Sequence, residues 1–401
     1  MSPSPLDAPA TPPGRDFPGA DLLGGLASKR APLAVLYQAA FPPPIDGIRK
    51  PMKPGGYSDS GADLAFILRT AGYPVVTPVA HPEPRRDFDW VFPDLESGVR
   101  AALAAGAQIL WANTVLFERH PLEAVLREVW VVGQVPERVQ RHDDKWLTNS
   151  LLRQHHCPVA RAALIGREPG AGVTSLRELA SRSCLAEQGL DFPLVVKPVR
   201  GRGSQGVVKV ESLPQLIAEA DRLLSMTVNV DAQEFPVYGT RLIVEEYLPG
   251  EEVTVTVMPP GAYEIGGEER TCPVPWALPL VRRFNHLNGI APYNGVVAVI
   301  HNSAVVDPGE LDSALAAPLL AACIKAAEIV GAMAPIRIDC RATAAGDYLI
   351  FDLNMKPNMT GAGRPGRDDQ DSLTSMAARA IGWSYRDLLE NMLRQAWRLR
   401  P

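Results

Sequence analysis

The sequence predicts an α/β fold, with a parallel-sheet domain on the N-terminal side and an α+β region after it. Between residues 31 and 141, short apolar strand candidates alternate with helix-like segments, a pattern typical of a parallel sheet covered on both faces. After residue 142 the pattern changes to β-rich stretches that follow one another directly, with a long alanine-rich helix among them. We therefore expect one parallel sheet followed by sheets built largely from hairpins.

In the first region, order is expected to begin at residues 32–37, a short apolar strand. Residues 1–30 are rich in Pro, Gly, Ala and Asp without apolar periodicity, and we interpret them as a disordered tail. Further strand candidates are residues 73–77, 108–111 and 129–132, and helix candidates are residues 60–71, 98–105 and 121–129.

In the second region, two β-rich stretches cover residues 194–210 and 242–257. Residues 336–352 are typical of two strands joined by a turn at residues 344–346. Helix candidates are residues 147–155, 311–330, 372–381 and 384–397.

Composition excludes several classes of protein. The 401 residues are 46% hydrophobic and carry a net charge of -5, so nothing favours nucleic acid or an anionic membrane as partner. No apolar run approaches 18 residues, and the N-terminus lacks the pattern of a secretion signal. Five scattered cysteines without CxxC spacing fit reduced thiols. We expect a cytoplasmic protein.

A glycine-rich segment provides the strongest local motif. Gly201, Gly203 and Gly206 formally satisfy G-x-G-x-x-G, but a dinucleotide site needs a helix to begin there, and residues 207–210 are strand-like instead. Strand, glycine loop and strand indicate a hairpin whose backbone N–H groups can surround phosphate, with Lys197 on the incoming strand. The alternative is a flexible surface hairpin with an ordinary lysine.

An acidic cluster lies near the C-terminus. If residues 336–341 and 348–353 pair, alternation places Arg337 and Asp339 on one face, and Asp352 and Asn354 also share a face. Asp339, Asp352 and Asn354 then converge as hard oxygen ligands suited to Mg²⁺. Arg337 is placed to stabilise charge on a reacting carbonyl oxygen. The alternative is a solvated strand edge with ordinary charge pairs.

Between these two motifs, residues 242–253 form an apolar strand that ends in acidic residues and a Pro-Gly turn. Such a segment suits a nucleoside, with backbone groups for the adenine edge and a carboxylate for the ribose hydroxyls. Taken alone, these residues are better explained as a strand that ends in a charged turn.

Together and in this order, the motifs resemble the ATP-grasp superfamily and, within it, the D-alanine–D-alanine ligases, from about Gly55 to the C-terminus. The resemblance is carried by Asp144-Lys145, Lys197-Pro198 with the glycine segment, residues 245–252, Arg337-x-Asp339 with residues 352–360, and residues 372–382. It implies a three-domain ATP-grasp fold, with an N-terminal domain at 31–141, a central ATP-binding lid at 142–252 and a C-terminal domain at 253–401.

The resemblance also implies roles for individual residues. It assigns ATP to Lys145, Lys197, Gly201, Gly203, Ser204, Gly206, Glu245, Glu246, Leu248, Glu252 and Arg283. It assigns one or two Mg²⁺ ions, or Mn²⁺ in their place, to Asp339, Asp352 and Asn354, and catalysis to Arg337, Lys197 and Ser204. It assigns substrate to Ser58, Asp59, Asn358 and Ser372.

The implied activity is ATP-dependent ligation of a carboxylate to an amine through an acyl phosphate. By this resemblance the expected partners are a small-molecule carboxylate and an amine, and we expect a homodimer. Two alternatives stay open: a hydroxyl or carrier-bound acceptor, and a nucleotide-binding regulatory protein that has lost catalysis.

The departures from the ligases surround the substrates. Asp59 is the nearest candidate for the glutamate that holds the first D-alanine's ammonium, and about nine extra residues, with Arg364 and Arg367, separate Thr360 from Ser372. The ligases' central phosphate-contacting lysine is missing, so Arg282 or Arg283 is expected to replace it. Residues 285–295 are turn-rich and expected near the active site. We expect a substrate other than D-alanine in a dedicated small-molecule pathway.

Overall fold

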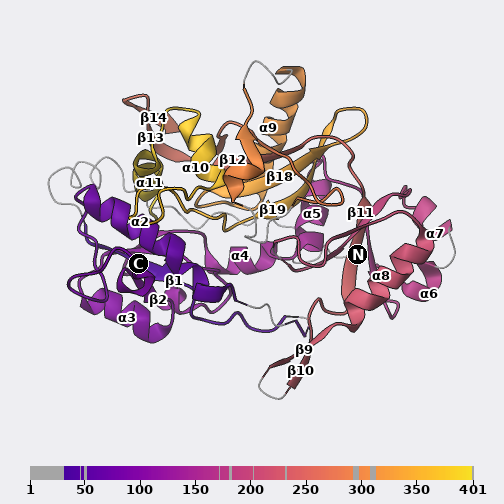
Figure 1. Ribbon diagram of the computed structural model, residues 1–401, viewed down its shortest axis with the longest axis horizontal. Helices are drawn as coiled ribbons and strands as arrows, with labels where there is room; N and C mark the ends of the chain where they lie inside the picture. Colours follow the sequence, from indigo (N-terminus) through magenta and orange to yellow (C-terminus); the bar gives the residue numbers. More distant parts are fainter. Residues whose placement is uncertain are drawn as a thin grey trace.

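The computed structural model describes residues 31–45, 47–48, 52–170, 172–179, 183–201, 203–230, 233–291, 298–307 and 313–399. Within these ranges the strands form three large sheets and two small hairpins, arranged along the long axis of the molecule (Figure 1). The predicted tail, residues 1–30, lies outside the described ranges. No helix among the described residues has the length and apolar character to cross a membrane.

The first sheet has the strand order β2-β1-β3-β4, and each neighbouring pair is parallel. Its strands are β1 (Leu33–Tyr37), β2 (Val91–Pro93), β3 (Ile109–Asn113) and β4 (Trp130–Val132). Helix α2 (Ser58–Thr70) shares a core with Leu33 and Val35, and α3 (Glu96–Ala104) shares a core with Ala34 and Leu36. Because successive side chains point to opposite faces, β1 is apolar throughout, as predicted.

Two segments of this region form a different type of secondary structure from the one predicted. Residues 73–77 make only a bridge between Val75 and Leu33, because Pro74 lacks the N–H that a longer ladder requires. Residues 121–129 were predicted as a helix, but only the short 3-10 helix η3 (Pro121–Val125) forms. The ring of His120 accepts a hydrogen bond from the Leu122 backbone N–H and so caps the N-terminus of η3.

The second sheet has the order β6-β5-β11-β7-β8. Its strands are β5 (Ala162–Gly166), β6 (Val173–Ser175), β7 (Leu194–Pro198), β8 (Val208–Val210) and β11 (Arg241–Glu246). Helices α6 (Leu176–Leu179), α7 (Ser183–Ala186) and α8 (Leu213–Ser225) pack on it, and β9 (Thr227–Val230) and β10 (Gln233–Pro236) form a separate hairpin. Strands β7 and β8 are antiparallel on either side of the glycine segment, which confirms the predicted hairpin.

The third sheet has the order β17-β16-β12-β18-β19, with β15 beside β12. Its strands are β12 (Glu252–Met258), β15 (Trp276–Ala277), β16 (Val281–Arg283), β17 (Ser303–Val305), β18 (Ile336–Ala342) and β19 (Tyr348–Asn354), with the hairpin β13 (Gly261–Ile265) and β14 (Glu268–Cys272) nearby. Helix α9 (Ser313–Ile329) buries one face against Val253 and Val255. Helices α10 (Leu373–Arg379) and α11 (Tyr385–Arg394) join the core on the opposite side.

The connecting helices and the end of the chain both contribute to the contact between the first and third sheets. Helices α4 (Pro136–His142) and α5 (Lys145–Gln154) lead from β4 to the middle of the molecule, where α5 packs on β19. At the end of the chain, Trp397 exchanges backbone hydrogen bonds with Val131 of β4, at 2.7 and 2.9 Å.

Candidate active site

The site begins with the pairing of β18 and β19. In their register Arg337 lies opposite Asn354 and Asp339 lies opposite Asp352, followed by a bulge after Asp339. The four side chains predicted from alternation are thus brought together on one face. Asp339 is almost completely buried, and its two oxygens accept hydrogen bonds from Thr254 at 2.8 Å and from Arg337 at 3.0 Å.

The two aspartates differ in electrostatic environment. Burial raises the pKa of Asp339, and the carboxylates of Asp352 and Glu252 add to the rise, against the opposing effect of Arg337. Burial acts on Asp352 in the same direction, but the ammonium groups of Lys145 and Lys197 outweigh it and lower the pKa of Asp352. The site therefore keeps at least one carboxylate charged beside two lysines.

Helix α5 supplies the first of these lysines. Asp144 accepts a hydrogen bond from the Leu147 backbone N–H at 2.8 Å and so caps the helix, which sets the direction of Lys145 at its first turn. The Lys145 ammonium lies 2.5 Å from the Asp352 carboxylate. The Asp352 charge raises the pKa of Lys145 even though burial lowers it. Lys145 is fully charged at neutral pH.

Strand β7 supplies the second lysine. The Lys197 ammonium donates to Glu245 on the neighbouring β11 at 2.6 Å and to the Phe351 carbonyl at 2.9 Å. Both side chains of the pair are only 5% exposed. Burial raises the pKa of Glu245 while Lys197 opposes the rise. A lysine predicted for phosphate and a glutamate predicted for adenine are therefore direct neighbours.

The glycine segment passes over the same space. Gly203, Ser204 and Gly206 have positive φ angles of 61°, 55° and 71°, and a Cβ on Gly206 would approach Pro198 and Tyr238 to 2.9 Å. The Ser204 hydroxyl donates to the Ala291 carbonyl at 2.9 Å. The segment thus contacts the loop before residue 292, although the rest of the predicted loop, residues 292–297, lies outside the described residues.

A cleft with a free volume of about 200 Å³ opens between these groups. Many residues predicted from the sequence line it: Lys145, Lys197, Gly201, Gly203, Ser204, Glu245, Glu246, Leu248, Glu252, Arg337, Asp352 and Asn354. Asp339 lies buried behind Arg337 and Asp352, and Gly206 sits at the turn of the segment. The structure therefore brings the predicted nucleotide and metal residues to one place.

Other predicted residues lie outside the lining of this cleft. Arg283 is buried on β16, where it donates to Ser303 at 3.0 Å. Ser372 is the N-cap of α10 and accepts a hydrogen bond from Ser375. Asn358 is exposed and accepts a long hydrogen bond of 3.4 Å from the Thr360 N–H. Ser58 is buried in the first turn of α2.

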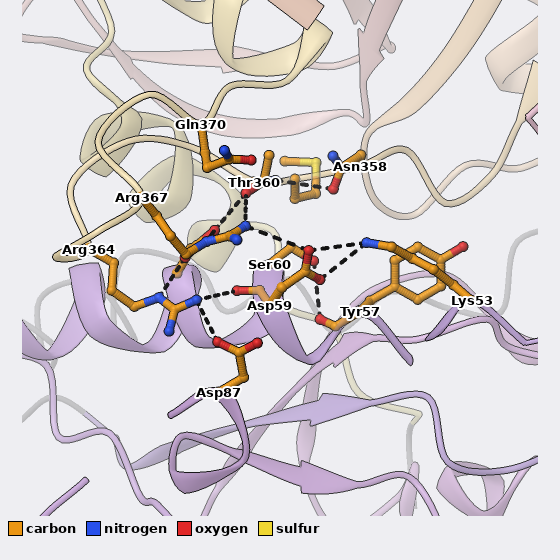
Figure 2. Close-up of polar contacts among 12 residues, drawn as sticks. Lys53, Tyr57, Asp59, Ser60, Asp87, Asn358, Thr360, Arg364, Arg367 and Gln370 are labelled. Atoms are coloured by element: carbon orange, nitrogen blue, oxygen red, sulfur yellow. Dashed lines mark hydrogen bonds and ion pairs between the residues drawn. The ribbon is translucent and has the colours of Figure 1, made fainter. Parts of the chain in front are cut away.

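Asp59 belongs to a group of charged side chains that we name the α2 cluster, drawn in part in Figure 2. Its members are Lys53, Asp59, Asp63, Asp87, Arg364 and Arg367. The Lys53 ammonium lies 3.1 Å from Asp59, and an Arg367 nitrogen lies 3.6 Å from the same carboxylate. Burial alone would raise the pKa of Asp59, but Lys53 lowers it below its ordinary value. Asp59 is a charged and paired carboxylate.

The extra residues after Thr360 form the other half of the α2 cluster. Arg364 is only 1% exposed and lies 2.7 Å from both Asp63 and Asp87. Arg367 reaches the same Asp63 at 2.8 Å. Their guanidinium groups fasten the segment to helix α2, as Figure 2 shows. The insertion is therefore an internal clamp between the first and third sheets.

Sequence reasoning assigned no site role to several residues of the cleft, among them Tyr57, His142, Arg341 and Lys356. The Lys356 ammonium stands 3.3 Å from the centre of the Tyr57 ring. Arg341 donates to the Gly289 carbonyl at 2.5 Å and to the Tyr247 hydroxyl at 3.2 Å. The alternation that selected Arg337 also selects Arg341, and this was the pattern that pointed to it. Nothing comparable pointed to the other three.

Two other glutamates predicted to contact ATP, Glu246 and Glu252, also interact with neighbouring side chains. Glu246 accepts hydrogen bonds of 2.7 Å from the backbone N–H and from the guanidinium of Arg161. The His286 ring lies 2.9 Å from Glu252. Glu246 is the last residue of β11, Glu252 is the first residue of β12, and both line the cleft, so the acidic segment is more than a solvated charged turn.

Solved structures share this architecture. A D-alanine–D-alanine ligase from Bacillus anthracis complexed with ATP superimposes with a TM-score of 0.58 at 16% identity, covering 91% of this chain and 98% of that one. The VanG D-Ala:D-Ser ligase from Enterococcus faecalis gives 0.60 at 15% identity, covering 90% and 98%. At these identities the likeness establishes the fold alone, which is the ATP-grasp fold.

Sequence comparison then defines the family. A family model described as D-ala D-ala ligase C-terminus matches residues 175–394, more than half of the chain, and the chain belongs to this family. A D-alanine–D-alanine ligase from Cupriavidus taiwanensis is 28% identical over 207 residues, or 52% of this chain and 53% of the relative. One from Haemophilus influenzae is 25% identical over 250 residues, or 62% and 69%. The chain spans about half the length of several of the curated relatives that it matches.

Proposed function

We propose that this chain is an ATP- and Mg²⁺-dependent ligase that joins a carboxylate to an amine through an acyl phosphate. The observation that carries the proposal is the meeting of Lys145, Lys197, Asp352 and Arg337 at one cleft. Phosphoryl transfer followed by acyl transfer requires cations that bind phosphate, carboxylates that bind a metal ion and a donor that stabilises an oxyanion. The cleft contains all three kinds of group. Family membership and a relative solved with ATP support it.

The donor set fits Mg²⁺. Asp339, Asp352 and Asn354 offer hard oxygen atoms from paired strands, and Mg²⁺ is commonly held by one or two carboxylates together with substrate phosphates. In the described part of the chain no group of three His, Cys, Asp or Glu side chains forms a metal site. The ion, when bound, would neutralise charge on the phosphates. Metal binding would draw Asp352 away from Lys145 and leave that ammonium for phosphate.

The chain's own residues account for the remaining steps. Lys145, Lys197 and the glycine segment would hold the triphosphate while an oxygen of the donor carboxylate bonds to the γ-phosphorus and the bond to the bridging oxygen of ADP breaks. The amine nitrogen then attacks the acyl carbon. As the bond to the phosphate oxygen breaks, phosphate leaves and the nitrogen loses a proton. Arg337 would stabilise the tetrahedral oxyanion; loss of one such donor typically raises the barrier by roughly 3–4 kcal/mol.

The glycine segment would also exclude water from the acyl phosphate. Ser204 donates a hydrogen bond to the Ala291 carbonyl, and the segment would close further over a bound substrate. An exposed acyl phosphate would be lost to hydrolysis, which makes this closure part of the proposed mechanism.

The test is release of ADP and phosphate from Mg²⁺-ATP with pooled carboxylic acids and amines, D-alanine included, followed by mass spectrometry. We expect a product whose mass equals acid plus amine minus water. Arg337→Ala should lower turnover by about 10²–10³-fold while ATP still binds. Arg386→Ala, which removes an exposed guanidinium paired with Glu390, is the matched control and should turn over normally.

Two other outcomes separate the rival functions. A product with an alcohol or a carrier-bound group, and none with amines, would replace the amine acceptor but keep the acyl phosphate. Tight ATP binding without turnover in any pool would favour a regulatory nucleotide-binding protein. The homodimer and the domain boundaries stay predictions, which sedimentation and limited proteolysis respectively can test. The cytoplasmic location also stays a prediction.

A further inference from the structure

We propose that the donor acid carries a second anionic group, a carboxylate or a phosphate, and that the Lys356 ammonium binds this group beside the Tyr57 ring. This inference rests on the proposed function, because it names the class of carboxylate that the same site activates. It depends on where Lys356 and Tyr57 lie in the cleft and on how the acids of the cleft wall are paired.

The cleft is lined by residues from both ends of the molecule. The first and second sheets lie at opposite ends of the long axis (Figure 1), and the second sheet supplies Lys197 and Glu245, which are expected to bind ATP. From the side of the first sheet come Tyr57, directly before α2, and Val115, directly after β3. If ATP lies against the second sheet, the donor acid occupies the part next to the first sheet, with its reacting carboxylate at Arg337.

Lys356 lies in this donor part, close to the expected metal site. Its backbone N–H donates a hydrogen bond of 2.9 Å to the side-chain oxygen of Asn354, and both residues line the cleft. Its ammonium stands 3.3 Å from the centre of the Tyr57 ring. Asn354 in turn lies opposite Arg337 in the strand pair. A donor whose carboxylate lies at Arg337 therefore has the Lys356 ammonium beside the rest of its chain.

Tyr57 is held in a fixed position at this end of the cleft. Its φ angle is 65°, which residues other than glycine rarely adopt. Its carbonyl accepts hydrogen bonds from Asn113 at 2.9 Å and from Ser60 at 3.2 Å. The Lys53 ammonium is also near the ring, 5.1 Å from its centre, as Figure 2 shows. Because the face of an aromatic ring attracts cations, Tyr57 holds two ammonium groups at the donor end.

The acids of the cleft wall argue against a donor that is recognised through an ammonium group. Each of them has a cation at a nitrogen–oxygen distance of 2.5–3.9 Å: Asp143 has Arg200, Glu245 has Lys197, Glu246 has Arg161, Glu252 has Arg341 and Asp352 has Lys145. Asp59, beside the donor part, has Lys53 and Arg367. A substrate ammonium would have to displace one of these cations, whereas an anionic group is attracted to Lys356. The charges of the site therefore favour an anion on the donor.

The experiment uses hydroxylamine as a general acceptor. Its nitrogen attacks the acyl carbon of an acyl phosphate, phosphate leaves with the electron pair of the broken bond, and the nitrogen loses a proton to give a hydroxamate. The full chain with Mg²⁺-ATP is given acids that share a chain length and differ in the terminal group: pentanoate, glutarate, γ-phosphonobutyrate and γ-aminobutyrate. A shorter series contains butyrate, succinate, β-phosphonopropionate and β-alanine.

We expect the diacid or the phosphonate to exceed the matched monoacid in kcat/KM by about tenfold or more, the usual effect of one hydrogen bond to a charged group. Whichever of the two is better identifies the second group as a carboxylate or a phosphate. The amino acid of each series should be no better than the monoacid.

Two variants of Lys356 change the charge at the donor end. Lys356→Met keeps an unbranched side chain against the ring and should lower the ratio of kcat/KM for the better anionic acid to that for the monoacid by about tenfold, with ATP affinity unchanged. Lys356→Glu should make γ-aminobutyrate a better donor than glutarate. Lys325→Glu makes the same charge reversal on the exposed side of α9 and should leave the ratio unchanged. Because the ratio compares two acids on one variant, a general loss of stability does not alter it.

A ratio that stays constant in Lys356→Met overturns this inference and leaves the ligase intact; if ATP affinity falls at the same time, the ammonium serves the nucleotide instead. A wild-type preference for the monoacids or the amino acids overturns it as well. So does a donor without a second anionic group, should the pooled assay yield one when these two series give no hydroxamate. Absence of hydroxamate with every acid, together with no ADP release in any pool, overturns the proposed function and the inference with it.

Discussion

Lys145 and Asp352 are 207 positions apart in the chain, yet the ammonium of one lies 2.5 Å from the carboxylate of the other. Lys145 belongs to the first turn of α5, and Asp352 belongs to β19, the edge strand of the third sheet. In the proposed function the lysine turns to phosphate and the aspartate to metal. The pair therefore couples the two binding events, since separating it for one ligand prepares the site for the other.

This coupling is measurable as the effect of Mg²⁺ on ATP affinity. In Asp352→Asn we expect the gain in ATP affinity on adding Mg²⁺ to fall by about tenfold or more, which corresponds to roughly 1.4 kcal/mol. In Lys145→Met we expect weaker ATP binding both with and without Mg²⁺. Asp347→Asn, exposed in the turn of the same hairpin, is the control. Titration calorimetry checks all three, and an unchanged Mg²⁺ effect in Asp352→Asn would remove Asp352 from the metal set.

The buried pair of Lys197 and Glu245 leads to a prediction about stability. Lys197→Met leaves Glu245 without its ammonium partner in the interior, which should lower the free energy of unfolding by about 3–5 kcal/mol. Adding Glu245→Gln removes the uncompensated charge, so the double variant should recover part of that loss while ATP binding stays weak. Urea unfolding gives both values. Equal stabilities of the single and double variants would contradict the interpretation.

The sequence predicted which residue types form the site better than it predicted the contacts between residues that are far apart in the chain. Alternation in β18 and β19 was sufficient to place Arg337, Asp339 and Asp352 together, because in a paired strand the side-chain period determines the face. The contact of Lys145 with Asp352 depends on how α5 packs against β19, which no local pattern records. For the same reason the sequence resemblance, which predicts a substrate role for Asp59, does not reveal that Arg367 from the insertion reaches this carboxylate in the folded chain.

The α2 cluster makes the insertion a structural clamp, and this too is testable. Arg364→Met leaves Asp63 and Asp87 with fewer cationic contacts, and since Arg364 is 1% exposed we expect a loss of about 3–5 kcal/mol in unfolding free energy. Arg100→Met removes an exposed pair with Glu96 on α3, where the expected loss is about 0.3–0.5 kcal/mol. Similar losses from both substitutions would show that the clamp does not stabilise the fold.

His142, at the end of α4 in the wall of the cleft, gives a prediction about pH. Burial and the neighbouring Arg141 and Arg138 lower the pKa of His142 to about 4, against about 6.5 in the unfolded chain. Below pH 6.5 the His142 side chain therefore binds a proton in the unfolded chain, whereas in the folded chain it binds this proton only near pH 4. Stability attributable to this residue is complete above pH 6.5, falls as the pH drops from 6.5 to 4, and changes no further below 4.

The size and the control of this effect follow from the same two pKa values. The loss across the interval is up to about 3 kcal/mol, at 1.36 kcal/mol for each pKa unit. His142→Gln cannot take up the proton, so wild type should lose more stability than the variant between pH 7 and pH 4.5 by about that amount. His81→Gln replaces an exposed histidine and should follow the wild-type curve. Urea unfolding at a series of pH values measures the free energy of unfolding of each variant. If this free energy fell equally with pH in wild type and His142→Gln, folding would not lower the pKa of His142.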